Sequence, residues 1–276
     1  MRIAYFGGDM FYPCLELLLG SGHEIIALYT NLPDSDEYDY TKNICAQGES
    51  LGLPVLNSKP ANDDITDLRR KGCDMILSAG YRYKIPPWQG GSLRYGINIH
   101  PSFLPEGGGP MPLPFVIIKG LEKTGVTLHK LSQHWDDGDI VLQDKIHLRG
   151  NENLEDLLRE SQTLATKLLR RFLDSPEDCW NKAFPQVRQP GDYWPMAPTD
   201  RFVVDYNKGV DRVEKYLRAH RFINPDGMVE FVSGVRFWQQ DHQYDPGTII
   251  SQDNNIYTMA AADGLVSFKL ERHQLE

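Results

Sequence analysis

Basic residues are in the minority in this chain of 276 residues, where 29 Lys and Arg face 38 Asp and Glu for a formal net charge of −9. Such an excess of negative charge opposes non-specific attraction to nucleic acid or to an anionic membrane. Long apolar runs are also missing, since none approaches the ~20 residues of a membrane span. The N-terminus has no signal-peptide layout. We therefore expect a cytoplasmic protein without membrane or nucleic-acid partners.

Cysteine is scarce, and its four copies are scattered. No Cys-x-x-Cys pair occurs and no histidine stands close to a cysteine at ligand spacing, so neither a zinc site nor a disulfide framework is indicated. The neighbouring carboxylates Asp136 and Asp137 lack a third ligand at fitting spacing. We expect no bound metal, and free thiols packed in the core at Cys14, Cys45, Cys73 and Cys179.

The glycine fingerprint of dinucleotide-binding proteins is incomplete at the N-terminus. A buried strand at 2–6 leads into Gly7, Gly8 and Asp9 and then into a helical pattern, but no third glycine follows. A dinucleotide cofactor is therefore not expected. The turn offers helix N-terminal amides to a phosphate of a substrate, and the alternative is a plain tight turn.

Strand-like, turn-like and helical stretches alternate through the first two thirds of the chain. This alternation indicates an α/β fold with an open sheet, not an all-β or bundle fold. A long amphipathic helix at 152–173 precedes a stretch rich in Pro and Trp, and short strand-like runs follow. We expect a first domain at 1–173, a linker at 174–200 and a small β-rich domain at 201–276.

A short apolar strand runs into a proline-closed loop with the sequence Asn98-Ile99-His100-Pro101-Ser102-Phe103-Leu104-Pro105. Residues two apart on a strand project from the same face, so Asn98 and His100 are expected to point into one space. An amide and an imidazole directed at one point bind a developing oxyanion and handle a proton. The alternative is a structural pair, with Asn98 capping a turn and His100 bonded to the backbone.

A second motif comes from the strand that begins Thr124-Gly125-Val126-Thr127 and from the acidic loop Asp136-Asp137-Gly138-Asp139-Ile140-Val141. In this order and separation the two motifs resemble those of the folate-dependent formyltransferase family, whose pattern is Asn-x-His-Pro-Ser-Leu-Leu-Pro, Thr-Gly-Val-Thr and Asp-x-Gly-Asp/Pro-Ile-Leu/Val. Phe103 is the one departure in the first motif, where the family usually has leucine. The chain is most similar to the sugar N-formyltransferase branch.

The resemblance implies an open, mostly parallel Rossmann-like sheet with an open-barrel-like C-terminal domain. It implies an enzyme with the catalytic residues Asn98, His100 and Asp136, where 136 − 100 = 36 residues separate the last two. The co-substrate is N10-formyltetrahydrofolate, and no metal is needed. On the residues alone, Asp137 and Asp139 compete with Asp136, and only the aligned motif favours Asp136.

The implied chemistry is attack of a neutral primary amine on the formyl carbon, which turns the carbonyl oxygen into an oxyanion. Asn98 and a protonated His100 are expected to stabilise that oxyanion by hydrogen bonds. Asp136 is expected to hold His100 in its charged form and to accept the proton that the amine loses, directly or through water.

Two loops correspond to segments that line the pterin pocket in the family. Such a pocket depends on backbone donors and acceptors between apolar walls, and the alternative for the first loop is an ordinary solvated turn. The residues implied to bind the folate are Arg82, Tyr83, Lys84, Ile85, Leu131, Gln133 and His134. We assign Gly7, Gly8, Asp9 and Ser102 to the acceptor substrate.

The expected acceptor is a small amine, most simply a nucleotide-linked amino sugar. Transfer RNA needs a basic surface, but residues 201–276 carry 9 basic and 11 acidic side chains, for 9 − 11 = −2. Aromatic residues available to stack on a base or sugar are Tyr193, Trp194, Phe222 and Trp238. Hydroxyornithine-type amino acids, methionyl-tRNA and hydrolysis of the formyl-folate stay open as alternatives, as does a homodimer.

Overall fold

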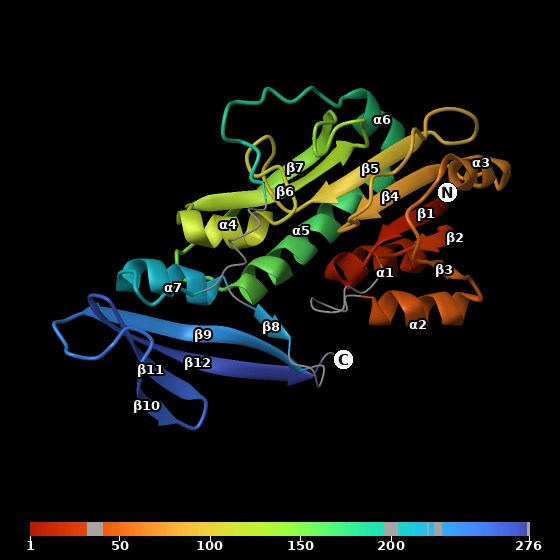
Figure 1. The fold of residues 1–276 in the computed structure, drawn as a ribbon. Coiled ribbons are helices and arrows are strands. Elements are labelled where there is room, and N and C mark those ends of the chain that lie inside the picture. The colour runs from red at the N-terminus through yellow and green to blue at the C-terminus, as the bar shows by residue number, and fades with distance from the viewer. Residues whose placement is uncertain (32–40, 196–203, 220, 224–227, 275–276) are drawn as a thin grey trace. The chain divides into compact units, whose positions relative to one another are not determined.

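The structure is a computed structural model, and it describes residues 1–31, 41–195, 204–219, 221–223 and 228–274 (Figure 1). Part of the predicted linker and the loop at 32–40 therefore lie outside the described residues. Cys14 and Cys73 are buried free thiols as expected, but Cys45 is exposed and Cys179 is half-buried. These last two lie on the helices α2 (Lys42–Leu51) and α6 (Pro176–Asn181), so the expectation of four core thiols is wrong.

A seven-stranded sheet with the strand order β3-β2-β1-β4-β5-β6-β7 forms the centre of the N-terminal region. Its first five strands in that order pair in parallel, and β6 runs antiparallel to β5. The predicted open, mostly parallel α/β sheet is confirmed. The strand bounds are Arg2–Gly7 for β1, Glu24–Tyr29 for β2, Val55–Leu56 for β3, Met75–Ala79 for β4, Tyr95–His100 for β5, Lys123–Lys130 for β6 and Ile140–His147 for β7.

Helices connect these strands where the sequence changes to a helical period. α2 ends where Gly52 adopts φ 65°, a left-handed conformation that glycine takes at little cost. No helix in the described part of the chain is both long and apolar enough to cross a membrane. The helix bounds are Asp9–Phe11 for the 3-10 turn, Tyr12–Gly20 for α1, Lys42–Leu51 for α2, Asn62–Arg70 for α3, Leu154–Asp174 for α5 and Pro176–Asn181 for α6.

Both faces of the sheet are covered, because its parallel strands are apolar on both sides. On one face Tyr95 meets Phe172 of α5 edge to face, with 5.5 Å between ring centroids. On the other face Phe6 belongs to a buried cluster with Ile65 and Leu68 of α3. The strands are thereby held rigidly, and the loops after their carboxyl ends are the places where polar side chains collect.

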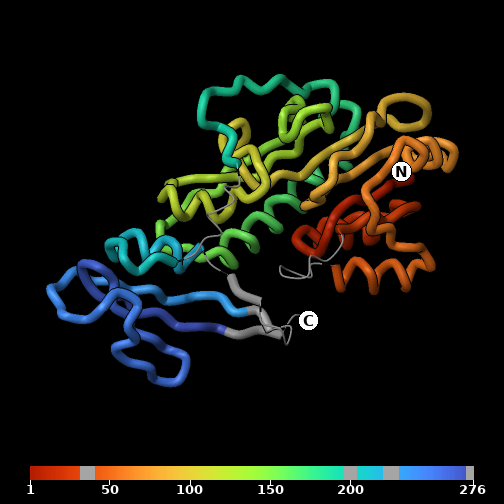
Figure 2. Tube along the Cα trace, in the orientation of Figure 1, coloured from red at the N-terminus to blue at the C-terminus, as the bar shows by residue number. Residues whose placement is uncertain are grey.

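The segment after α6 returns to this sheet and adds short backbone pairings to it. Phe184 forms an antiparallel bridge with Ile140, and Tyr193 forms a parallel bridge with Gly108. In Figure 2 this segment loops away from α6 and comes back beside the loop that follows β5. The chain thus brings residues 184–194 against the loop that follows β5 and the turn that carries Asp136.

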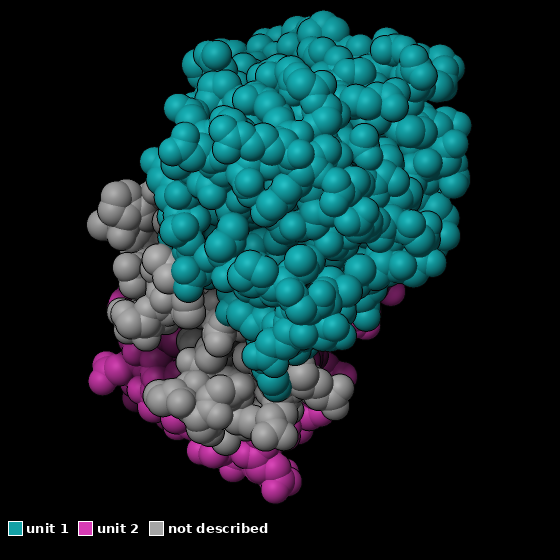
Figure 3. Space-filling model, turned by 90° about the vertical axis from the view of Figure 1, so that its right-hand side faces the viewer, with its two compact units in different colours: residues 1–110, 124–146, 160–194 teal, residues 111–123, 147–159, 195–276 magenta. Residues whose placement is uncertain are grey.

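Contacts divide the chain into two compact units, which Figure 3 colours separately. The first unit contains the seven-stranded sheet. The division does not follow one cut in the sequence, because each unit combines three segments. Unit 1 comprises 1–110, 124–146 and 160–194, and unit 2 comprises 111–123, 147–159 and 195–276.

Unit 2 contains a five-stranded sheet of order β10-β11-β12-β9-β8, and its described pairings are antiparallel. The predicted β-rich C-terminal region is confirmed. Its core combines Val210, Val213 and Leu217 of α7 with sheet residues such as Val232 and Val266. The bounds are Pro112–Lys119 for α4, Val210–Arg218 for α7, Arg221–Ile223 for β8, Met228–Gln239 for β9, Ile249–Asp253 for β10, Ile256–Ala261 for β11 and Gly264–Gln274 for β12.

A buried ion pair lies beside this core. The guanidinium of Arg218 donates from Nη2 to Glu214 Oε2 at 3.1 Å and from Nη1 to the carbonyl of Glu152 at 2.6 Å. Both side chains of the ion pair are about nine-tenths buried. A buried charge is tolerated only when its partners replace water, so this pair is a stability element of unit 2.

Candidate active site

Strands β5 and β6 place four polar side chains on one face of the sheet. Their register sets Asn98 opposite His129 and His100 opposite Thr127. Directly opposed side chains share a face, as do residues two apart on a strand. The row formed by Asn98 and His100 is therefore continued by His129 and Thr127 from the next strand.

Asp136 comes from the turn after β6, and its carboxylate faces two imidazoles. Oδ1 lies 3.5 Å from Nδ1 of His100 and 3.7 Å from Nε2 of His129. Oδ2 accepts a hydrogen bond of 2.9 Å from the backbone N–H of Gly109. The structure therefore brings Asp136 and His100 together, and it links Asn98 to them through His129, whose Nε2 is 3.0 Å from Asn98 Nδ2.

The two competing carboxylates are occupied elsewhere. Asp137 Oδ1 lies 3.2 Å from Nε of Arg188, and Asp139 Oδ2 lies 3.1 Å from Nζ of Lys130. Both are ion pairs at the edge of the turn, whereas Asp136 is only 9% exposed and points to the imidazoles. The geometry favours Asp136 among the three.

Gly138 is required for this turn to close. A Cβ at this position would lie 1.8 Å from the carbonyl oxygen of Lys130, much closer than atoms can approach. The backbone N–H of Lys130 in turn donates to the carbonyl of Asp139 at 2.9 Å. The glycine of the acidic motif thus lets the chain pass against β6 and sets the position of Asp136.

His100 is buried between two acceptors. Its Nε2 lies 2.8 Å from the carbonyl of Gly107, and its Nδ1 faces Asp136. Burial lowers the pKa of His100 because it disfavours the charged ring, although the Asp136 carboxylate and the Gly107 carbonyl act in the opposite direction. Our expectation of a protonated resting His100 is therefore corrected: the neutral imidazole predominates near neutral pH.

The pKa of Asp136 is lowered well below its usual value. Burial alone would raise it, but the nearby imidazoles of His100 and His129 and the hydrogen bond from the Gly109 N–H together outweigh that effect. Asp136 is consequently a carboxylate at any physiological pH, and its charge is available to the two imidazoles.

His129 is a site residue that the sequence reasoning missed. It is 2% exposed, and its Nδ1 lies 3.0 Å from the carbonyl of Lys130, which makes Nδ1 the donor. Its Nε2 is then free to accept from the amide of Asn98. The two-residue period from Thr127 was the only sequence signal, and it becomes informative once the pairing of β5 with β6 is known.

The loop after β5 packs around His100. Ser102 is buried, and its hydroxyl has no hydrogen-bond partner among the described residues. A Cβ at Gly107 would come within 3.0 Å of the Trp194 ring. Gly107 and Gly109 of this loop therefore allow the close approach of Trp194.

The predicted folate-binding loops meet in one place. Tyr83, Ile85 and Leu131 all pack, partly buried, against the cluster that contains Phe6, and the indole of Trp88 donates to the Leu131 carbonyl at 3.3 Å. The three side chains are apolar and only partly buried, and their predicted role in binding the folate stays a prediction. The remaining predicted residues, Arg82, Lys84, Gln133 and His134, are exposed.

The turn at Gly7, Gly8 and Asp9, which was predicted to bind a substrate phosphate, has a structural role in the fold. The Asp9 carboxylate accepts hydrogen bonds from the backbone N–H groups of Asn43 at 2.8 Å and Ile44 at 3.0 Å, so it caps the N-terminus of α2. Gly7 and Gly8 lie at the carboxyl end of β1. A carboxylate at this turn repels phosphate, so its charge does not support the predicted role.

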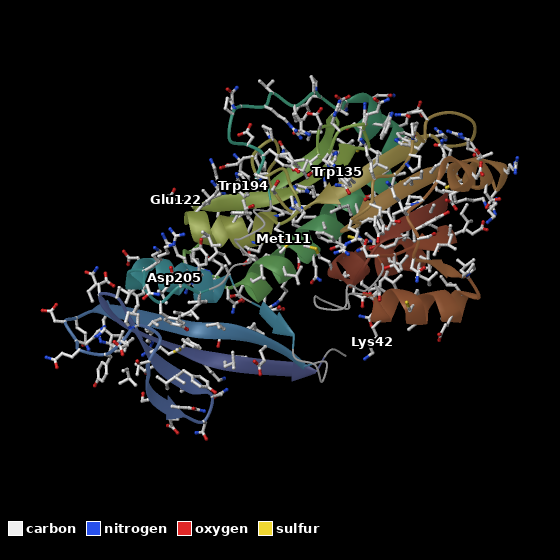
Figure 4. The ribbon with its side chains drawn as sticks, viewed as in Figure 1. Lys42, Met111, Glu122, Trp135, Trp194 and Asp205 are labelled. Atoms are coloured by element: carbon white, nitrogen blue, oxygen red, sulfur yellow. The ribbon has the colours of Figure 1, made fainter. Side chains whose placement is uncertain are left out.

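The aromatic residues fall in different settings. Trp194 is 6% exposed and cannot stack on a ligand as it stands, whereas Tyr193 is 43% exposed and Trp135, not singled out from the sequence, is 47% exposed. Figure 4 labels Trp135 and Trp194. Trp238 is exposed in unit 2, and the side chain of Phe222 lies outside the described residues.

No group of three or more His, Cys, Asp or Glu side chains that would hold a metal ion occurs among the described residues. The imidazoles of His100 and His129 both face the Asp136 carboxylate. An amide, two imidazoles and a carboxylate in a largely buried cluster match the needs of a reaction that develops an oxyanion and moves a proton.

Residues 1–173 match the family described as Formyl transferase. Among curated proteins, the methionyl-tRNA formyltransferase of Anaplasma phagocytophilum is 32% identical over 230 residues, covering 79% of this chain and 74% of that protein. That of Anaplasma marginale is 30% identical over 226 residues, with the same coverage of 79% and 74%.

Two solved structures have a similar fold. The sugar 3N-formyl transferase WlaRD gives a TM-score of 0.67 at 15% identity and covers 98% of this chain and 97% of its own. The N-formyltransferase from Helicobacter canadensis, solved with folinic acid and dTDP-3-aminofucose, gives a TM-score of 0.66 at 14% identity and covers 99% and 100%. At these identities the similarity concerns the fold.

Proposed function

Because this chain belongs to the formyl transferase family, we propose that it moves a formyl group from N10-formyltetrahydrofolate to a primary amine. The observation that carries the proposal is the position of Asp136 between His100 and His129, with Asn98 bonded to His129. Each group needed for acyl transfer to an amine is present there as a side chain of suitable type.

His100 is the proposed acceptor of the proton that the amine loses. Its Nε2 faces a carbonyl acceptor and therefore carries the proton of the neutral ring, which leaves Nδ1, beside Asp136, to take a proton. As the amine nitrogen bonds to the formyl carbon, it loses a proton to this ring, directly or through water. The charged imidazole is then paired with the Asp136 carboxylate. The same proton goes to N10 of the departing tetrahydrofolate.

The oxyanion of the intermediate needs hydrogen-bond donors in a water-poor place. One N–H of the Asn98 amide is used by His129, and the second is free to donate to the oxyanion. A donor of this kind typically contributes about 2.7 to 4 kcal/mol to the transition state. In this proposal the donor substrate lies along the side chains of Tyr83, Ile85 and Leu131, with its formyl group directed to Asn98.

For the acceptor we propose a nucleotide-linked amino sugar. Support comes from the net charge of −9, which is unfavourable for the many phosphate contacts of transfer RNA, and from the fold shared with sugar N-formyltransferases. Exposed Tyr193 and Trp135 beside the catalytic loops offer rings for stacking.

Methionyl-tRNA is the second candidate, because the relatives with the highest identity reported above are methionyl-tRNA formyltransferases. A panel of amino-sugar nucleotides, amino acids such as hydroxyornithine and methionyl-tRNA, each offered with the formyl-folate, decides between them. We expect an amino-sugar nucleotide to be formylated with the highest kcat/KM. Efficient formylation of methionyl-tRNA alone would replace the sugar proposal, and formate release without any amine would indicate a hydrolase.

A further inference from the structure

Two side chains of the segment after α6 donate hydrogen bonds to the turn that carries Asp136, and we call these contacts the grip on the turn. The proposed chemistry uses neither side chain. The first is Gln186, whose side-chain Nε2 donates to the carbonyl of Asp136 at 2.9 Å and to the carbonyl of Gly138 at 2.8 Å. One amide group therefore spans the turn from Asp136 to the glycine that lets the turn close.

The second is Arg188, which contacts three consecutive residues of the same turn. Its Nη2 donates to the carbonyl of Trp135 at 3.1 Å and to the carbonyl of Asp136, and its Nε lies 3.2 Å from the Asp137 carboxylate. A planar guanidinium can satisfy several acceptors at fixed angles, which a lysine ammonium on its flexible stem cannot do.

The backbone at Asp136 explains why such a grip is needed. Its φ is 50°, a left-handed conformation that residues other than glycine adopt reluctantly. Conformations of this kind persist where the surrounding structure over-determines them. Without a hold on the Asp136 carbonyl the turn would be free to relax, and the carboxylate would move away from His100 and His129.

We propose that Arg188 and Gln186 are positioning residues that fix the Asp136 carboxylate between the two imidazoles. The inference rests on the proposed function, because it assumes that Asp136 takes part in formyl transfer. The contacts of both side chains given above are all with the turn from Trp135 to Gly138. We therefore expect their loss to slow the chemical step and to leave substrate binding nearly unchanged.

The segment itself does not depend on these two side chains for its place. Phe184 and Ile140 exchange backbone hydrogen bonds of 2.8 and 3.1 Å, and Trp194 N–H donates to the Gly108 carbonyl at 2.6 Å. These bonds lie on either side of Arg188 in the sequence. Replacing Arg188 therefore removes the grip on the turn while the segment stays docked at both ends.

The test compares Arg188→Met and Gln186→Met with Lys182→Met as the matched control. Lys182 is a cation of the same region whose ion pair with Asp178, at 2.8 Å, is exposed. We expect Arg188→Met to lower kcat by about 10- to 100-fold, in line with the cost of small misplacements of catalytic groups. KM for the formyl-folate should stay within about threefold, and Lys182→Met should match the wild type.

Arg188→Lys and a double variant separate positioning from plain stability. Arg188→Lys should recover part of the lost kcat, because one ammonium reaches one of the three acceptors. In an Asp136→Asn background, Arg188→Met should lower the remaining kcat by no more than about twofold, since residues that act as a unit are not additive. If Arg188→Met does not fold, Gln186→Met gives the same comparison with a smaller loss.

The inference is overturned if Arg188→Met and Gln186→Met keep the kcat of Lys182→Met, or if Arg188→Met multiplies the loss caused by Asp136→Asn. A failure of the proposed function looks different, because the wild type would then transfer no formyl group to any amine, or Asp136→Asn would keep full activity.

Discussion

The replacement of Asp136 by Asn is the most informative single change in the proposed site. The two side chains have nearly the same shape, and the Asn oxygen can still accept the hydrogen bond that Gly109 N–H now donates to Oδ2 at 2.9 Å. What disappears is the negative charge 3.5 Å from His100 and 3.7 Å from His129. The variant therefore isolates electrostatics from packing.

The size of the effect follows from the burial of these groups. Electrostatic stabilisation by one preorganised group in a water-excluded site is worth about 2.7 to 4 kcal/mol, or about 10²- to 10³-fold in kcat. The pKa of His100 should fall further below its usual value in the variant, because the Asp136 carboxylate is the strongest influence that favours the charged ring. The ring would then accept the proton of the amine less readily.

The assay follows tetrahydrofolate release at saturating amine, with the His100 protonation state followed by NMR of the imidazole. Asp144→Asn is the matched control, because Asp144 makes an exposed ion pair with Lys167 at 3.3 Å, and exposed pairs contribute little. We expect the control to behave as wild type. A kcat of Asp136→Asn within threefold of the control, with the protein folded, would refute the assigned role of Asp136.

Three further predictions concern stability and binding. Burial lowers the pKa of His100 in the folded state, so the unfolded chain takes up a proton at His100 more readily than the folded chain does. The protein should therefore lose stability as the pH falls below the ordinary histidine pKa of about 6.5. His100→Gln should flatten the pH dependence of the melting temperature in that range. Arg218→Ala leaves Glu214 buried without its partner and should cost about 3 to 5 kcal/mol in denaturant unfolding, whereas unchanged unfolding would show that the pair contributes nothing. Replacing Tyr83 and Ile85 together by Ser should weaken calorimetric binding of a folate analogue at least tenfold, since these apolar side chains are removed; equal affinity would move the pocket elsewhere.

The sequence was sufficient for the sheet and for the shared face of Asn98 and His100, for reasons that are local. Apolar runs bounded by glycine and proline predicted the strands of unit 1, and the two-residue period placed Asn98 and His100 on one face. The acidic motif required a tight turn, and the clash that a side chain at Gly138 would make with Lys130 shows why.

Other features depend on pairings between distant segments, which local patterns do not contain. His129 became a site residue only through the register of β5 with β6, and the grip of Arg188 on Asp136 joins residues 52 positions apart. The neutral state of His100 follows from its burial, which no motif reports. The hydrogen bonds that the Asp9 carboxylate accepts from the start of α2 likewise join segments more than 30 residues apart.

The central claim, that this cluster transfers a formyl group to an amine, is tested most directly by following the formyl carbon itself. Wild-type protein is mixed with N10-formyltetrahydrofolate labelled with ¹³C in the formyl group, with and without an amino-sugar nucleotide, beside His100→Ala and Asp136→Asn. We predict that the label appears as an N-formyl amide only when the amine is present and that both variants transfer it at least about 100-fold more slowly. Label released as formate at the same rate with or without the amine, or transferred equally fast by both variants, would contradict the account.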